Sequence, residues 1–89
     1  MQNKNKYIIN KDNFFEKTDN SLIVYNDMEA FVLNNLEKNI LEYFNGLFDL
    51  YEISNILSQK YSNYNENEFH DFVNELIIKS IIVPYDQGV

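Results

Sequence analysis

The side chains best suited to chemistry lie in residues 65–79, where a single histidine stands among four acidic residues. His70 is followed directly by Asp71, and a histidine beside a carboxylate can serve as a general base or a metal ligand. Neighbouring residues on a helix point in different directions, however, and the chain holds no second histidine and no cysteine. We therefore expect no catalytic residue, no metal site and no cofactor, and a protein that is not an enzyme.

The charge of the chain restricts its partners. Fourteen acidic residues against seven basic ones give a net charge of −7 and a pI near 4.4. Such a surface repels phosphate backbones and favours a neutral or basic partner. The acidic stripe of Glu68, Asp71 and Glu75 has two interpretations: a contact for Lys or Arg of a peptide, or an ordinary solvated face with Glu75 and Lys79 as an i,i+4 ion pair.

Hydropathy predicts a single soluble cytoplasmic domain that does not bind a membrane. The apolar run Tyr7–Ile9 is too short for a signal-peptide core, and no run elsewhere exceeds four residues. The absence of cysteine agrees with a reducing compartment. We expect a disordered segment over residues 1–6, one domain over residues 7–83 and a tail over residues 84–89.

Strand patterns dominate the first third of the chain. Apolar residues 7–9 and 14–15 on either side of polar residues 10–13 predict a first strand with a kink. Residues 21–25 and 29–34 flank the turn-forming pair Asn26-Asp27 and predict a hairpin.

The second strand of this hairpin is apolar on both faces. Phe31 and Leu33 share one face by the period of two, and Ala30 and Val32 share the other. A strand with one solvated face does not need that much apolar surface.

Three repeated start signals predict three helices, near residues 35–44, 50–61 and 66–79. Asn34, Asp49 and Asn65 each stand three residues before a glutamate, which is the spacing of a capping box. The expected buried stripes are Leu36, Ile40 and Phe44; Leu50, Ile53, Ile56, Leu57 and Tyr61; and Phe69, Phe72, Val73, Leu76 and Ile77.

The helix ends also have signals. Asn45-Gly46 ends the first helix by its tolerance of left-handed angles, and Pro84 keeps the segment after the third helix extended. The order predicts an α+β fold, winged helix-turn-helix-like, in which three N-terminal antiparallel β-strands are followed by three α-helices.

Several segments together resemble the PqqD-like proteins, also called recognition elements for ribosomally made, modified peptides (RiPP recognition elements). The resemblance covers roughly residues 14–83. It depends on apolar positions around Val32–Asn34, Ile40–Leu41, Phe44–Gly46, Glu52–Leu57, Tyr61 and Glu68–Leu76, followed by the isoleucine-valine segment 81–83. Two positions depart from the family pattern: Asp49 replaces a Thr or Ser cap, and Ser80 replaces a Gly.

The resemblance implies a non-catalytic protein that binds the leader segment of a precursor peptide. In that family an extended leader adds antiparallel to the third strand, and its side chains enter a groove against the third helix. Implied partners are the leader peptide and a peptide-modifying enzyme, either a radical-SAM enzyme or a leader peptidase. The implied peptide-binding residues here are Glu29, Ala30, Phe31, Val32 and Leu33 on the strand.

Helical periodicity leaves two flanks open for the wall provided by the third helix. One flank carries Phe72 and continues into Glu68, Glu75 and Lys79; the other carries Val73 and Ile77. We expect the second flank to face the groove. The predicted wall residues are Phe69, Val73, Leu76 and Ile77.

Two alternative functions fit the same expected topology. A winged-helix DNA-binding regulator would need a basic recognition helix, but residues 65–79 carry four acids and one lysine, so no nucleic acid is expected. A generic homodimerising interaction module would instead pair the third strand with a second copy of the chain.

Overall fold

The computed structural model describes residues 4–27 and 29–85 of the chain. The elements follow in the order β1 (Lys6–Ile9), β2 (Phe14–Lys17), β3 (Ser21–Tyr25), β4 (Ala30–Asn34), α1 (Asn35–Leu41), β5 (Asn45–Asp49), α2 (Leu50–Lys60), α3 (Glu66–Ile78) and β6 (Ile82–Pro84).

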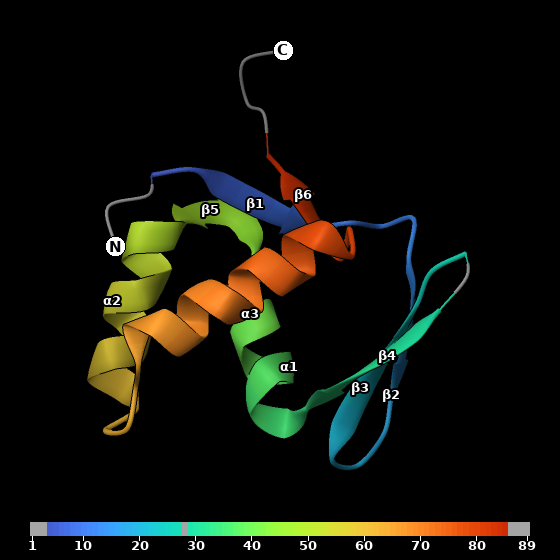
Figure 1. Ribbon diagram of the computed structural model, residues 1–89, viewed down its shortest axis with the longest axis horizontal. Helices are drawn as coiled ribbons and strands as arrows, with labels where there is room; N and C mark the ends of the chain where they lie inside the picture. The colour runs from blue at the N-terminus through green and yellow to red at the C-terminus, as the bar shows by residue number, and fades with distance from the viewer. Residues whose placement is uncertain (1–3, 28, 86–89) are drawn as a thin grey trace.

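The strands form two separate antiparallel sheets. One sheet has the order β5-β1-β6, and the other has the order β2-β3-β4. Figure 1 shows α3 running diagonally between them, with β5-β1-β6 at the top and β2-β3-β4 at the lower right.

This arrangement corrects the expected fold class, because the strands do not all precede the helices and do not form one sheet. The expected kinked first strand is in fact β1 and β2, which belong to different sheets. Between them, the Asn10 N–H donates to the Ile81 carbonyl at 2.9 Å, and the side-chain amides of Asn10 and Asn13 donate to the Ser80 carbonyl. These bonds turn the chain away from β6 before β2 begins.

The strand β5 is the second correction. The Asn45-Gly46 pair was expected to end the first helix, but α1 ends at Leu41 and Gly46 lies inside β5 with φ of 84°. Glycine is needed there because a Cβ would lie 3.1 Å from the Tyr85 ring in a backbone region that other residues avoid. The register of β1 against β5 shifts at the same place.

The start of the domain also differs from expectation. Lys6 was placed in a disordered segment, but it begins β1, and the Asn5 carbonyl accepts the Leu50 N–H at 3.1 Å. Residues 1–3 of that segment and residues 86–89 of the expected tail lie outside the described part of the chain.

All three predicted helix caps are present. Asn34 and Asp49 form full capping boxes with Glu37 and Glu52, and the Asn65 side chain accepts the Glu68 N–H at 3.0 Å. The hairpin of β3 and β4 also has the expected bounds within one residue.

One core joins both sheets and all three helices. Its largest fully buried side chains are Phe44, Ile53, Leu57, Leu76, Ile81, Ile82 and Val24. Leu36 was expected in this core, but it is 46% exposed, and Ile40 is only half-buried. The buried residue of α1 is Leu41, which lies on a flank of the expected stripe.

Candidate functional site

The strand β4 forms one edge of its sheet, and the only strand that pairs with it in the described residues is β3. The Asn26 N–H donates to the Glu29 carbonyl at 3.0 Å, which makes these two residues a hydrogen-bonded pair at the hairpin end. Antiparallel pairs alternate, so Ala30 and Val32 occupy the non-hydrogen-bonded positions opposite Tyr25 and Ile23. Their backbone N–H and C=O groups therefore point away from β3, toward the open edge.

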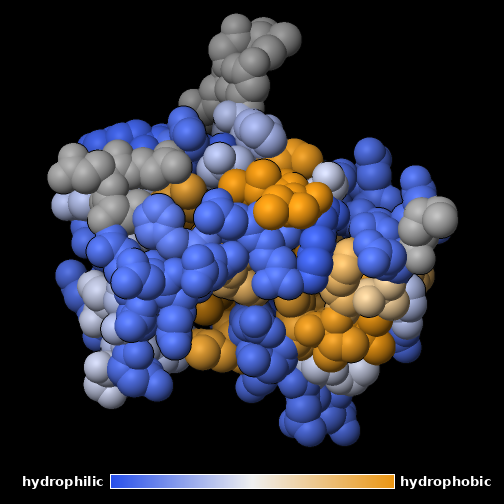
Figure 2. Space-filling model, in the orientation of Figure 1, coloured by the Kyte–Doolittle hydropathy of each residue, from blue (hydrophilic) through white to orange (hydrophobic). Residues whose placement is uncertain are grey.

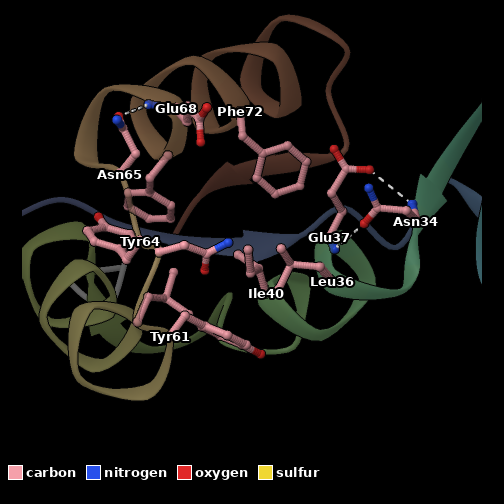
Figure 3. A pocket seen from close by; sticks show the side chains of 12 residues that line it. Asn34, Leu36, Glu37, Ile40, Tyr61, Tyr64, Asn65, Glu68 and Phe72 are labelled. Atoms are coloured by element: carbon pink, nitrogen blue, oxygen red, sulfur yellow. Dashed lines mark hydrogen bonds between the residues drawn. The ribbon is translucent and has the colours of Figure 1, made fainter.

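The open edge ends at Asn34. Its N–H donates to Glu37 Oε1 at 2.9 Å, and its side chain accepts the Glu37 N–H at 2.8 Å, as the dashed lines in Figure 3 show. The capping box that starts α1 thus removes Asn34 as an edge donor. Ala30 and Val32 provide the strand's open N–H groups.

A groove of about 260 Å³ runs between β4 and α3. We call it the β4–α3 groove. Its lining residues are Ala30, Phe31, Val32 and Leu33 from β4, Phe72, Glu75 and Leu76 from α3, and Glu37, Lys79 and Ile81. Its apolar floor and mixed-charge rim suit an extended peptide whose side chains alternate in and out.

Lys79 is one of the residues that line this groove. Its ammonium lies 4.4 Å from the centre of the Phe31 ring and forms an ion pair with Glu75 Oε1. The ion pair connects two positions one helical turn apart, and the contact with Phe31 ties the end of α3 to β4. These contacts hold the two walls of the groove together.

A second hollow of about 230 Å³ lies between α1, the α2–α3 connection and the start of α3. We call it the α1–α3 hollow. Figure 3 shows Leu36 and Ile40 rising into it from α1, the Phe72 ring reaching in from α3, and Tyr61 and Tyr64 closing its other end. Glu37 and Phe72 line both the hollow and the groove, so the two spaces are neighbours.

Figure 2 shows apolar surface in the hollows beneath α3, separated and bordered by hydrophilic residues. The hydrophilic border includes Glu37 and Glu68, and no lysine or arginine lines the α1–α3 hollow. This end of the surface is therefore acidic.

The strand residues expected to bind peptide mostly lie at the groove. Ala30, Phe31, Val32 and Leu33 line it, while Glu29 lies outside its lining. The side chains alternate: Leu33 is buried and Phe31 half-buried, whereas Val32 is 67% exposed on the other face of the sheet.

The helix residues are distributed differently from expectation. Leu76 lines the groove, and Phe69 lines the α1–α3 hollow, but Val73 and Ile77 line neither and pack in or against the core. The groove lies instead along the flank that carries Phe72, Glu75 and Lys79. The helical period identifies both flanks but cannot show which one faces the groove, because that depends on the position of β4.

The residues that could take part in catalysis or metal binding lie on the solvated surface. His70 and Asp71 are both exposed, and within the described residues no group of three His, Cys, Asp or Glu side chains could hold a metal ion. No helix in the described ranges has the length and apolar character to cross a membrane.

Comparison with known proteins gives a match at the level of fold. No family model and no curated protein matches the chain. The solved structure of the heterocyclase TruD matches with a TM-score of 0.69 at 15% identity, over 96% of this chain. The chain spans only 12% of the length of that heterocyclase, so the likeness concerns one part of a larger protein and shows the fold alone.

Proposed function

We propose that this chain binds an extended peptide by adding it as a further strand to the open edge of β4. The observation that carries the proposal is the position of this edge, directly beside the β4–α3 groove, which offers both apolar and charged side chains. Backbone groups of Ala30 and Val32 pair with the peptide, and alternate peptide side chains enter the groove. The chain itself performs no chemistry on the peptide.

Backbone hydrogen bonds at this edge are too few to bind a peptide without side-chain contacts. Two residues offer two N–H and two C=O groups, and four net hydrogen bonds of about 1 kcal/mol each give about 4 kcal/mol. Even without the entropy cost of association, that corresponds to a dissociation constant of about 1 mM, too weak for selective binding. Contacts with Phe31, Phe72 and Leu76 supply the remaining affinity and the sequence preference.

The peptide that we propose is the leader segment of a ribosomally made precursor. Two likenesses support this choice: the sequence resembles the PqqD-like proteins, and the fold resembles part of the heterocyclase TruD. The role is then to hold the leader while a peptide-modifying enzyme or a leader peptidase acts on the precursor.

A direct binding experiment tests this function. A fluorescent leader peptide, taken from a small open reading frame beside the gene, is titrated with the full chain. We expect a dissociation constant below about 100 μM, equivalent to about −5.5 kcal/mol. Binding weaker than this for every neighbouring candidate peptide would contradict the proposal.

The edge itself is tested by Val32→Pro. Proline removes the outward N–H of Val32 without touching the bonds to β3, and edge strands accept proline at such positions. We expect peptide affinity to fall about tenfold, the equivalent of about one hydrogen bond and its alignment. Urea unfolding of the free protein measures the accompanying change in stability, which should be smaller.

The matched control is Val32→Ala, which keeps the N–H and removes a side chain that is 67% exposed. It should bind peptide nearly as well as the unaltered chain. If both variants lose affinity equally, the Val32 side chain binds the peptide and the edge does not.

A further inference from the structure

The α1–α3 hollow lies beyond the Asn34 end of β4, next to the β4–α3 groove, with which it shares Glu37 and Phe72. We propose that this hollow is a second anchor site, which takes an apolar side chain on the N-terminal side of the strand-forming segment of the bound peptide. This inference rests on the proposed function. It adds that the peptide carries an apolar anchor residue outside the segment that pairs with β4.

The direction of the bound peptide determines on which side of its strand-forming segment the anchor residue lies. β4 runs from Ala30 to Asn34, so an antiparallel peptide ends near Ala30 and comes from the Asn34 side. The Asn34 N–H is already bonded to Glu37, so strand pairing cannot continue past this residue. The preceding peptide residues must leave the edge beside Asn34, which itself lines the hollow.

The walls of the hollow are held in place by contacts within the peptide-free protein. The hydroxyls of Tyr64 and Ser54 are hydrogen-bonded to each other, and Ser54 is buried in α2. The Tyr64 ring also packs against Phe69, with ring centres 6.1 Å apart. A rigid aromatic wall of this kind binds an apolar side chain with little loss of protein conformational freedom.

Leu36 indicates that this apolar surface serves a partner. It stands at the second position of α1, exposes 46% of its surface, and faces the hollow together with Ile40. The acidic border formed by Glu37 and Glu68 adds charge complementarity, because a Lys or Arg next to the apolar anchor would lie beside these carboxylates. The occupant is therefore an apolar residue flanked by a basic one.

The experiment selects displayed random peptides of about 12 residues, long enough for a strand of typical length and a preceding anchor. Selection is done in parallel on the full chain and on its Leu36→Glu, Leu47→Glu and Val32→Pro variants. Leu36→Glu places a carboxylate at the mouth of the hollow, in the first turn of α1 where acidic residues are favoured. Leu47→Glu is the matched control, since Leu47 is 67% exposed and lines neither space.

We expect peptides selected on the unaltered chain to share a β-prone core with an apolar residue at a fixed distance on its N-terminal side. Selection on Leu47→Glu should give the same pattern, whereas selection on Leu36→Glu should keep the core and lose the anchor. Replacing the anchor by alanine in one selected peptide should weaken binding to the unaltered chain at least tenfold, and binding to Leu36→Glu less than threefold.

Amide chemical shifts provide a second readout that does not depend on the variant. Titration with the selected peptide should shift the amides of Leu36, Asn63 and Asn65, and the alanine-substituted peptide should leave them unshifted. The inference would be overturned if Leu36→Glu weakened binding of the selected peptide and of its alanine-substituted form by the same factor. An anchor on the C-terminal side of the core would overturn it too. Either result would leave strand addition intact. Failure to select any peptide sensitive to Val32→Pro would overturn strand addition itself, and the second anchor with it.

Discussion

Ser80 ends α3 in a left-handed backbone conformation, with φ of 58°. The Ile81 N–H donates to the Leu76 carbonyl and the Ser80 N–H to the Ile77 carbonyl, which together make a Schellman motif. The PqqD-like proteins, which the sequence resembles, often have glycine at this position. Serine takes the less favourable left-handed angle here, and the side-chain amides of Asn10 and Asn13 donate to the Ser80 carbonyl.

Ser80→Gly should therefore stabilise the protein. Glycine removes a left-handed penalty of about 1–2 kcal/mol but adds about 0.4–1 kcal/mol of unfolded-state entropy, which leaves a gain of about 0.5–1 kcal/mol. Urea unfolding measures this gain. Ser58→Gly, inside α2, is the control and should destabilise, so a loss of stability in both variants would count against the role of the left-handed angle.

Tyr25 supplies a second prediction for a single residue. Its hydroxyl donates to Glu16 Oε1 at 2.8 Å. This hydrogen bond, followed by slight desolvation and by the charge of Glu16, raises the pKa of Tyr25 above its ordinary value of 10.0. The raised value means that the folded state favours the protonated phenol, so any stability it gives is complete below pH 10.0 and is lost as the pH rises through the raised pKa.

Glu16→Gln removes the negative charge and should lower the pKa of Tyr25 toward its ordinary value. The measurement is the phenolate absorbance in an alkaline titration, taken as the difference from the matching Tyr25→Phe protein so that the other tyrosines cancel. An unchanged difference titration would mean that Glu16 does not control this hydroxyl.

Among the structural elements, the helix caps determine where the walls of the site begin. Asp49 is buried, its side chain accepts the Glu52 N–H at 2.8 Å, and its own N–H donates to Glu52 Oε1 at 3.0 Å. Asp49 also ends β5, so one residue ends a strand and starts a helix. Asn34 does the same for β4 and α1, and in doing so it ends the open edge.

Asp49→Ala should lower the free energy of unfolding by about 1–2 kcal/mol, because the N–H groups at the start of α2 lose their acceptor. Asp49→Ser keeps a capping oxygen and should lose less than half as much. Thermal unfolding followed by circular dichroism compares the two variants. Equal losses would show that the burial of Asp49, and not its capping bond, is what the protein needs.

For the whole molecule, the net charge of −7 governs how fast a peptide arrives. A peptide with a basic residue beside its apolar anchor should associate with the chain faster at low salt. Stopped-flow fluorescence should show its association rate falling about tenfold as the ionic strength rises past physiological values, where the Debye length is about 8 Å. The same peptide with glutamine in place of lysine should show little salt dependence, and a similar slope for both would exclude electrostatic steering.

The sequence alone determined the local features of this protein. Capping oxygens at Asn34, Asp49 and Asn65 can be recognised without a structure because a cap and its glutamate act within a single turn. The hairpin of β3 and β4 followed from a period of two around a turn-forming pair. These signals placed the apolar strand next to a helix start, and so indicated where a peptide-binding edge was to be sought.

Only the tertiary structure decided which surfaces meet. The pairing of β1 with β6 joins residues more than seventy positions apart, and such contacts leave no local pattern. This pairing, together with β5 around Gly46, divided the strands into two sheets and positioned α3 so that Phe72, and not Val73, faces β4. A helical period shows which residues share a face, but the partner of that face depends on long-range packing, which is why the groove and the exposed Leu36 appeared only in three dimensions.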